Sequence, residues 1–131
     1  MAMLPSCGAN VATQCYKLQN VLIASQPSLA STTQAAEIER AEGYLALAES
    51  LSAQTVEDEI LVAHQVQLVA LYRQVGELLL AQTTLMEPDG RVIIRSAATD
   101  NDYRQLSQQL RETYDAIEPE RNALQLYCSL Q

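Results

Sequence analysis

The chain has 131 residues, of which 48% are hydrophobic, and its 16 acidic and 8 basic side chains give a net charge of −8. This hydrophobic share excludes a disordered acidic tail, and a chain of this length can form one domain with a buried core. The negative charge argues against binding to nucleic acid or to an anionic membrane surface, because both depend on excess Lys and Arg.

The first predicted helix covers residues 10–25, with Asn10 as its N-cap. Its apolar side chains recur at steps that place them on one helical face, namely Val11, Cys15, Leu18 and Leu22. Pro27 ends the helix, because the residue before a proline is pushed out of helical geometry. Residues 27–32 form a short polar connection.

A second helix is predicted to begin near Ser31 or Thr33, where small hydroxyl residues precede an apolar pattern. Its apolar face is thin and contains Ile38, Ala41, Leu45 and Ala48. Small side chains on this face would allow another helix to approach closely.

The third predicted helix starts at Thr55, which precedes three acidic residues in the first turn, and continues to about Met86. Its leucines and valine repeat every seven residues in two interleaved series. One series is Leu61, Leu68 and Val75, and the other is His64, Leu71, Leu78 and Leu85. This spacing is typical of a coiled-coil seam.

The segment Glu87–Gly90 predicts a turn that ends this helix, because Pro, Asp and Gly are favoured at successive turn positions. Between Arg91 and Arg95 lie three β-branched residues, 92–94. We expect them to form an apolar plug under a loop, with an extended strand as the alternative.

The last predicted helix starts at Thr99 or Asp100 and runs to the C-terminus. Its apolar residues keep one heptad register on both sides of Pro119. This continuity favours a single helix kinked at the proline. Two separate helices, the second beginning at Pro119, are the alternative.

Together these elements predict an all-α fold, an antiparallel up-down-up-down four-helix bundle with two longer C-terminal helices. Residues 1–131 would form one domain, with residues 1–9 as a flexible N-terminal segment. The chain has no Phe and no Trp, so Leu, Ile, Val and Ala must fill the core, which suits helix seams.

The long third and fourth helices present more apolar surface than two short helices can cover. We therefore expect a homodimer through a seam on these helices. The predicted seam consists of Leu61, His64, Leu68, Leu71, Val75, Leu78, Leu85, Tyr103, Leu106, Leu110 and Ile117.

The three cysteines are predicted to gather at one end of the bundle. Cys7 and Cys15 belong to the start of the first helix and Cys128 to the end of the last, and these lie at the same pole of an up-down-up-down bundle. A disulfide from Cys128 to Cys7 or Cys15 would require an oxidising compartment, which favours a periplasmic or secreted location. The alternative is a small buried hydrophobe at Cys15 and two free thiols.

The segment Leu4-Pro5-Ser6-Cys7-Gly8 resembles the lipobox of bacterial lipoproteins. It departs from that pattern at its proline, and the charged and apolar regions of a signal peptide do not precede it. The resemblance implies a lipid anchor at Cys7 as an alternative to the other states of this thiol.

His64, the only histidine, is expected to be a seam residue with one hydrogen bond. A metal site or a catalytic dyad with Cys15 and Cys128 is the alternative. A di-iron site needs two Glu-x-x-His pairs and is excluded by the single histidine. We therefore predict no enzyme activity, no metal and no cofactor.

The sequence favours a non-catalytic module that acts through contact with a protein partner, first of all a second copy of itself. No apolar stretch approaches the ~18–20 residues of a membrane span. The alternative function is a carrier of a small apolar ligand inside the bundle, where Ala41, Gly43 and Ala48 would leave space and tyrosine hydroxyls would supply polar contacts.

Overall fold

A computed structural model describes residues 7–24, 33–93 and 95–131. The helices in these ranges are α1 (Cys7–Ala24), α2 (Gln34–Ser52), α3 (Glu59–Thr83) and α4 (Ala97–Ser129). Within the same ranges the only β pairing is a single bridge between Met86 and Val92. The all-helical prediction is confirmed. The lipobox residues 4–6, the predicted connection 27–32 and Ile94 lie outside the described residues.

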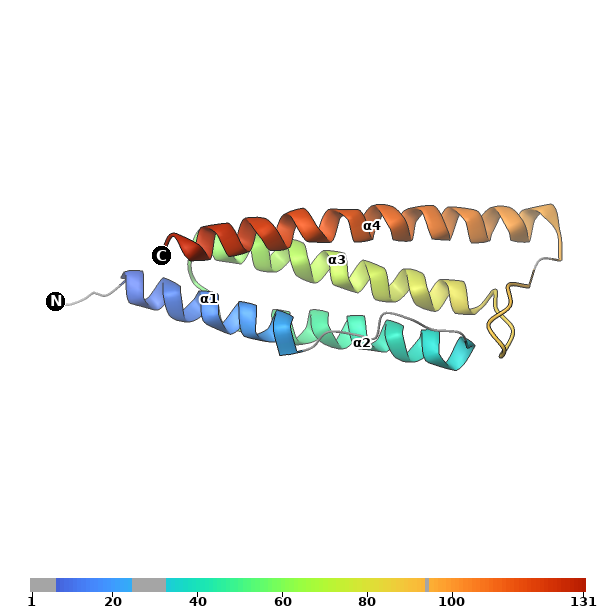
Figure 1. The fold of residues 1–131 in the computed structure, drawn as a ribbon, viewed down its shortest axis with the longest axis horizontal. Helices are drawn as coiled ribbons and strands as arrows, with labels where there is room; N and C mark the ends of the chain where they lie inside the picture. The colour runs from blue at the N-terminus through green and yellow to red at the C-terminus, as the bar shows by residue number, and fades with distance from the viewer. Residues whose placement is uncertain (1–6, 25–32, 94) are drawn as a thin grey trace.

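The helices lie side by side along one long axis, as Figure 1 shows. α3 packs along both α2 and α4, whereas α1 makes the smallest contacts with its neighbours. The start of α1, the end of α4 and the connection between α2 and α3 lie at one end of the molecule, which we call the disulfide end. The connection between α3 and α4 lies at the opposite end, the hairpin end.

The two C-terminal helices are the longer pair, as predicted, with 25 and 33 residues against 18 and 19 for α1 and α2. α4 runs through Pro119 as a single helix, so the alternative of two helices is wrong. Because α1 is short, it lies beside only the C-terminal half of α4 (Figure 1).

The helix starts depend on capping side chains, and three of them differ from the predictions. α1 begins at Cys7, so Asn10 lies inside the helix and residues 7–9 of the predicted flexible segment are helical. Thr33, one of the two predicted starts of the second helix, caps α2, since its Oγ1 accepts a hydrogen bond from the Ala36 N–H at 3.1 Å. Thr55 does not cap α3; Asp58 does, accepting from the Leu61 N–H at 3.1 Å. α4 starts before the predicted Thr99, at Ala97, because Ser96 accepts from the Thr99 N–H at 3.2 Å.

α3 ends at Thr83, before the predicted Met86, and the turn at Glu87–Gly90 follows. Gly90 has φ of 92°, a left-handed conformation that glycine adopts without strain. Its N–H donates to the Glu87 carbonyl at 2.8 Å, which closes the predicted turn. Val92 and Ile93 are half-buried beside this turn.

The core fills the space between the helices with leucines, as the absence of Phe requires. Its fully buried large side chains are Leu18, Leu51, Leu61, Leu68, Leu79, Leu124 and Val75. α2 and α3 approach closely at Gly76, where an added Cβ would lie 2.6 Å from Leu45 Cγ and 3.0 Å from the Ala41 carbonyl oxygen. The thin face predicted for α2 therefore does accommodate a close neighbour.

Candidate functional site

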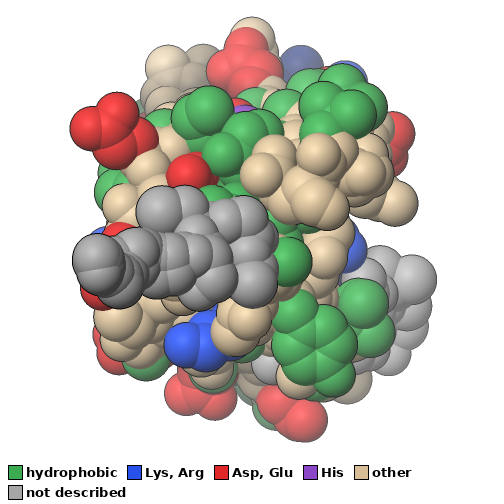
Figure 2. All heavy atoms as spheres, turned by 90° about the vertical axis from the view of Figure 1, so that its left-hand side faces the viewer, with side chains coloured by type: hydrophobic (Ala, Val, Ile, Leu, Met, Phe, Trp, Pro, Cys, Tyr) green, Lys and Arg blue, Asp and Glu red, His purple; other side chains and the backbone are tan. Residues whose placement is uncertain are grey.

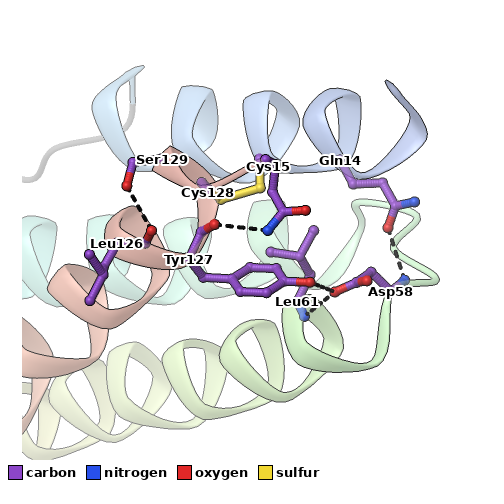
Figure 3. The surroundings of a disulfide bond; sticks show 9 residues. Gln14, Cys15, Asp58, Leu61, Leu126, Tyr127, Cys128 and Ser129 are labelled. Atoms are coloured by element: carbon purple, nitrogen blue, oxygen red, sulfur yellow. Dashed lines mark hydrogen bonds between the residues drawn. A yellow bond between two sulfur atoms is a disulfide. The ribbon is translucent and has the colours of Figure 1, made fainter. Parts of the chain in front are cut away.

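The disulfide end is joined covalently. Cys15 of α1 and Cys128 of α4 form a disulfide, with 5.7 Å between their Cα atoms (Figure 3). The predicted bond is therefore made with Cys15, and Cys7 is not part of it. Because both sulfurs are bonded to each other, neither is a thiolate that could join His64 as a metal ligand or nucleophile in this structure.

Buried polar contacts surround the disulfide, and sequence reasoning did not anticipate them. Gln14 is buried, and its Oε1 accepts hydrogen bonds from the N–H groups of Glu57 at 2.8 Å and Asp58 at 3.1 Å (Figure 3). Tyr127 donates its hydroxyl to Asp58 Oδ2 at 2.8 Å. That bond raises the pKa of Tyr127, because ionisation would place two negative oxygens together. These contacts tie α1 and α4 to the start of α3.

His64 lies near the same end, half-buried on α3, and its Nδ1 is hydrogen-bonded to the Glu120 carboxylate of α4. The expectation of a seam histidine with one hydrogen bond agrees with this geometry. Among the described residues, no three His, Cys, Asp or Glu side chains gather closely enough to hold a metal ion.

A cleft of about 740 Å³ opens between α1 and α4. α1 contributes Leu22 and Ile23 to its lining, and α4 contributes residues between Tyr114 and Gln125. Tyr44 of α2 and Tyr72 of α3 complete it. The cleft thus draws on all of the described helices, and its shape depends on where α1 is held by the disulfide.

Three tyrosines from different helices meet at this cleft. The rings of Tyr44 and Tyr72 are stacked with centroids 6.1 Å apart, and Tyr114 meets Tyr44 edge-on at 5.9 Å. Burial raises the pKa values of Tyr72 and Tyr114, because the charged phenolate is poorly solvated there. Both hydroxyls therefore keep their protons at neutral pH.

Two arginines contact the tyrosines from opposite helices. Arg40 of α2 lies 5.8 Å from the Tyr44 ring centroid and donates to the Tyr114 hydroxyl, while it also pairs with Glu37 at 3.4 Å. Arg121 of α4 donates to the Tyr72 hydroxyl at 3.3 Å. Arg121 and the three tyrosines therefore line the cleft among apolar side chains, whereas Arg40 contacts the tyrosines from outside the lining.

The residues predicted for the interface seam fall into two groups. Five are buried within the chain: Leu61, Leu68, Leu71, Val75 and Ile117. The others are half-buried, namely His64, Leu78, Leu85, Tyr103, Leu106 and Leu110. Of the seam, only Ile117 also lines the cleft.

Sequence reasoning missed Arg40, Arg121 and Tyr114 as members of one site. Their spacing held part of the signal, since Tyr114, Ile117 and Arg121 recur at helical intervals and so share a face of α4. The partners on α2 and α3 have no such signal, because their proximity is a property of the packed bundle.

No protein-family model matches the chain, and no curated protein and no solved structure is significantly similar to it. Within the described ranges, none of the helices combines the length and apolar composition that crossing a bilayer requires. The proposals below therefore stand on the geometry of the described residues.

Proposed function

We propose that this chain is a non-catalytic antiparallel four-helix bundle that acts through protein contact, as a homodimer formed by the hairpin-end halves of α3 and α4. The observation that carries the proposal is the burial along α4. Its buried residues are Thr113, Ile117 and Leu124, and none lies between Ala97 and Glu112. Half of a 33-residue helix therefore has no buried side chain within the described structure.

That half of α4 nevertheless carries an apolar face. Tyr103, Leu106 and Leu110 are half-buried and continue the line of Thr113 and Ile117 along the helix. Leu78 on α3 and Leu85, which follows the end of that helix, are also half-buried at the same end. A second copy placed against these side chains would remove them from water at about 25 cal/mol per Å² of apolar surface. A symmetric pair is the most common way to bury such a face.

Sedimentation velocity tests the dimer. We expect a dimer at tens of micromolar that dissociates on dilution. Replacing Leu106→Glu and Leu110→Glu together should give a folded monomer, because charges would be placed in the contact. Gln105→Glu is the matched control, since it adds charge at an exposed position of the same helix. A monomeric native chain at tens of micromolar would contradict the proposal.

The cleft supports a second candidate function, the carriage of a small ligand with an apolar body. Its volume of about 740 Å³ lies within the roughly 300–1,000 Å³ typical of small-molecule sites. An NMR titration with 1-octanol tests this function. Amides of Leu22, Tyr72 and Leu124 should shift, whereas that of Tyr103 at the hairpin end serves as the internal control. Absence of any shift at millimolar alcohol would argue against a carrier.

We further propose that the protein resides in an oxidising compartment, periplasmic or extracellular. The support is the disulfide between residues 113 positions apart, since such bonds rarely persist in a reducing cytosol. Intact mass after alkylation, with and without reductant, tests it for protein isolated from its native source. Three alkylated cysteines without reductant would contradict the assignment.

A further inference from the structure

Arg121 stands out among the positive charges of the chain. Arg40 and Arg121 are half-buried, whereas every other Lys and Arg is exposed. Arg40 has its counterion in Glu37. Arg121 forms no ion pair with any carboxylate of the described residues, and its hydrogen-bond partner is the neutral hydroxyl of Tyr72. A half-buried guanidinium without a counterion keeps N–H donors that can pair with an external anion.

The surroundings of Arg121 define the rest of the ligand. Leu22, Leu47, Ile117 and Leu124 supply apolar walls of the same cleft. Glu118 is the one acidic residue in the lining; it is exposed, and it forms no ion pair with Arg121. The cleft therefore presents one cationic group at the side of an apolar groove.

We propose that this cleft binds an amphipathic monocarboxylate, whose carboxylate pairs with the Arg121 guanidinium and whose hydrocarbon body lies against Leu22, Ile117 and Leu124. The inference rests on the carrier function and names its ligand class. A guanidinium offers parallel N–H donors that match the two oxygens of a carboxylate. The protonated Tyr72 hydroxyl beside it can donate a further hydrogen bond to the same anion.

The net charge of −8 opposes a preference for an anionic ligand. At long range the chain repels anions, so an affinity for a carboxylate above that for a neutral analogue must come from a local cation. An apolar cleft without a cationic group would bind the alcohol or the amine more tightly than the acid.

The experiment compares octanoate, 1-octanol and octylammonium, which share one hydrocarbon chain, by calorimetry and NMR titration on the disulfide-bonded protein. We expect octanoate to bind about tenfold or more tightly than 1-octanol, a difference of about 1.4 kcal/mol or more, because hydrogen bonds between charged groups are stronger than those between neutral groups. Octylammonium should bind no better than the alcohol. Shifts should map to the lining residues Leu22 and Leu124.

Two variants assign the preference to its residue. Arg121→Gln should bind octanoate no more tightly than octanol, whereas Arg111→Gln, which removes an exposed charge from the same helix, should leave the preference intact. Arg121→Lys keeps the charge and should retain part of the preference. It takes the place of Arg121→Gln in the test if circular dichroism shows that Arg121→Gln does not fold.

The outcomes separate this inference from the carrier function. Equal binding of octanoate and octanol to the native chain would overturn the monocarboxylate and leave the carrier standing. Binding of none of the three probes would overturn both. A preference for octanoate that survives in Arg121→Gln would overturn the role of Arg121. Loss of the preference in both a folded Arg121→Lys and a folded Arg111→Gln would also overturn it.

Discussion

Both ends of this molecule have apolar side chains at heptad spacing, but these side chains are buried to different extents at the two ends. At the disulfide end, Leu61 and Leu124 are at most 1% exposed, and a disulfide joins α1 to α4. At the hairpin end, Leu78, Leu106 and Leu110 have the same kind of spacing but stay half-buried. The difference is the presence of α1, which lies beside only the C-terminal half of α4 (Figure 1). Spacing therefore specifies a face, and a neighbour decides whether that face becomes core.

The outer surface of the disulfide end differs from its buried core. Figure 2 looks onto that end, where hydrophobic side chains form separate patches with acidic side chains around them. Leu126 and Leu130 near the end of α4 are 65% and 75% exposed. The disulfide therefore joins α1 and α4 at an end of the molecule whose outer surface is partly apolar.

The largest expected effect comes from removing the disulfide. Closing a loop between residues 113 apart stabilises the folded state by about 4–5 kcal/mol in the chain-entropy account. The double variant Cys15→Ala/Cys128→Ala should lose about this much in urea unfolding. Its α1 amides should also exchange faster with deuterium than those around Tyr103. Cys7→Ala is the control, and equal stability of all three chains would contradict the contrast between the ends.

Truncating one leucine at each end tests the contrast in the core itself. Leu124→Ala should destabilise the chain by about 2–5 kcal/mol, because the side chain is fully buried. Leu110→Ala should cost about 1 kcal/mol in the monomer, since its site is already half open. Urea unfolding at low protein concentration measures both. Equal losses would show that the hairpin end is packed as tightly as the disulfide end.

The contact between α2 and α3 is shared by both ends, and Gly76→Ala tests it. A Cβ there would lie within 3.0 Å of Leu45 and of the Ala41 carbonyl oxygen. Overpacking costs about 1–3 kcal/mol and helix propensity returns about 1 kcal/mol, so we expect a net loss of about 1–2 kcal/mol. Gly43→Ala on α2 is the control and should not destabilise. A more stable Gly76→Ala chain, measured by thermal unfolding, would show that the helices can separate.

The smallest expected effect is on the pH dependence of stability. Tyr72 and Tyr114 have pKa values above the ordinary tyrosine value of 10.0 in the folded chain, because burial desolvates both side chains. The unfolded chain loses these protons near pH 10, while the folded chain still holds them. Stability is therefore unaffected below that pH and falls as the pH rises above it.

Thermal unfolding and tyrosinate absorbance, followed from about pH 9 to about pH 11.5, measure this dependence. The loss of stability should shrink in Tyr72→Phe and in Tyr114→Phe, and each variant should lack one late-titrating tyrosine. Tyr16→Phe at an exposed position is the control. An unchanged alkaline profile in both cleft variants would argue against burial as the cause.

The sequence by itself determined the helical class, the start of α2 near Ser31 or Thr33 and the turn at Glu87–Gly90. These features depend on residues within one or two turns of each other, where periodicity, side-chain caps and glycine act locally. The up-down-up-down topology expected from the order of the helices placed Cys128 near Cys7 and Cys15 and left the choice between them open.

Tertiary structure decided the rest. At the start of α3, Gln14, more than 40 residues away, accepts hydrogen bonds from the N–H groups of Glu57 and Asp58. Arg121 donates a hydrogen bond to Tyr72 across a separation of 49 residues. The cleft lies where the end of α1 stands beside α4. Such contacts are absent from any window of the sequence, because their free energy is gained only when the packed helices bring the partners together.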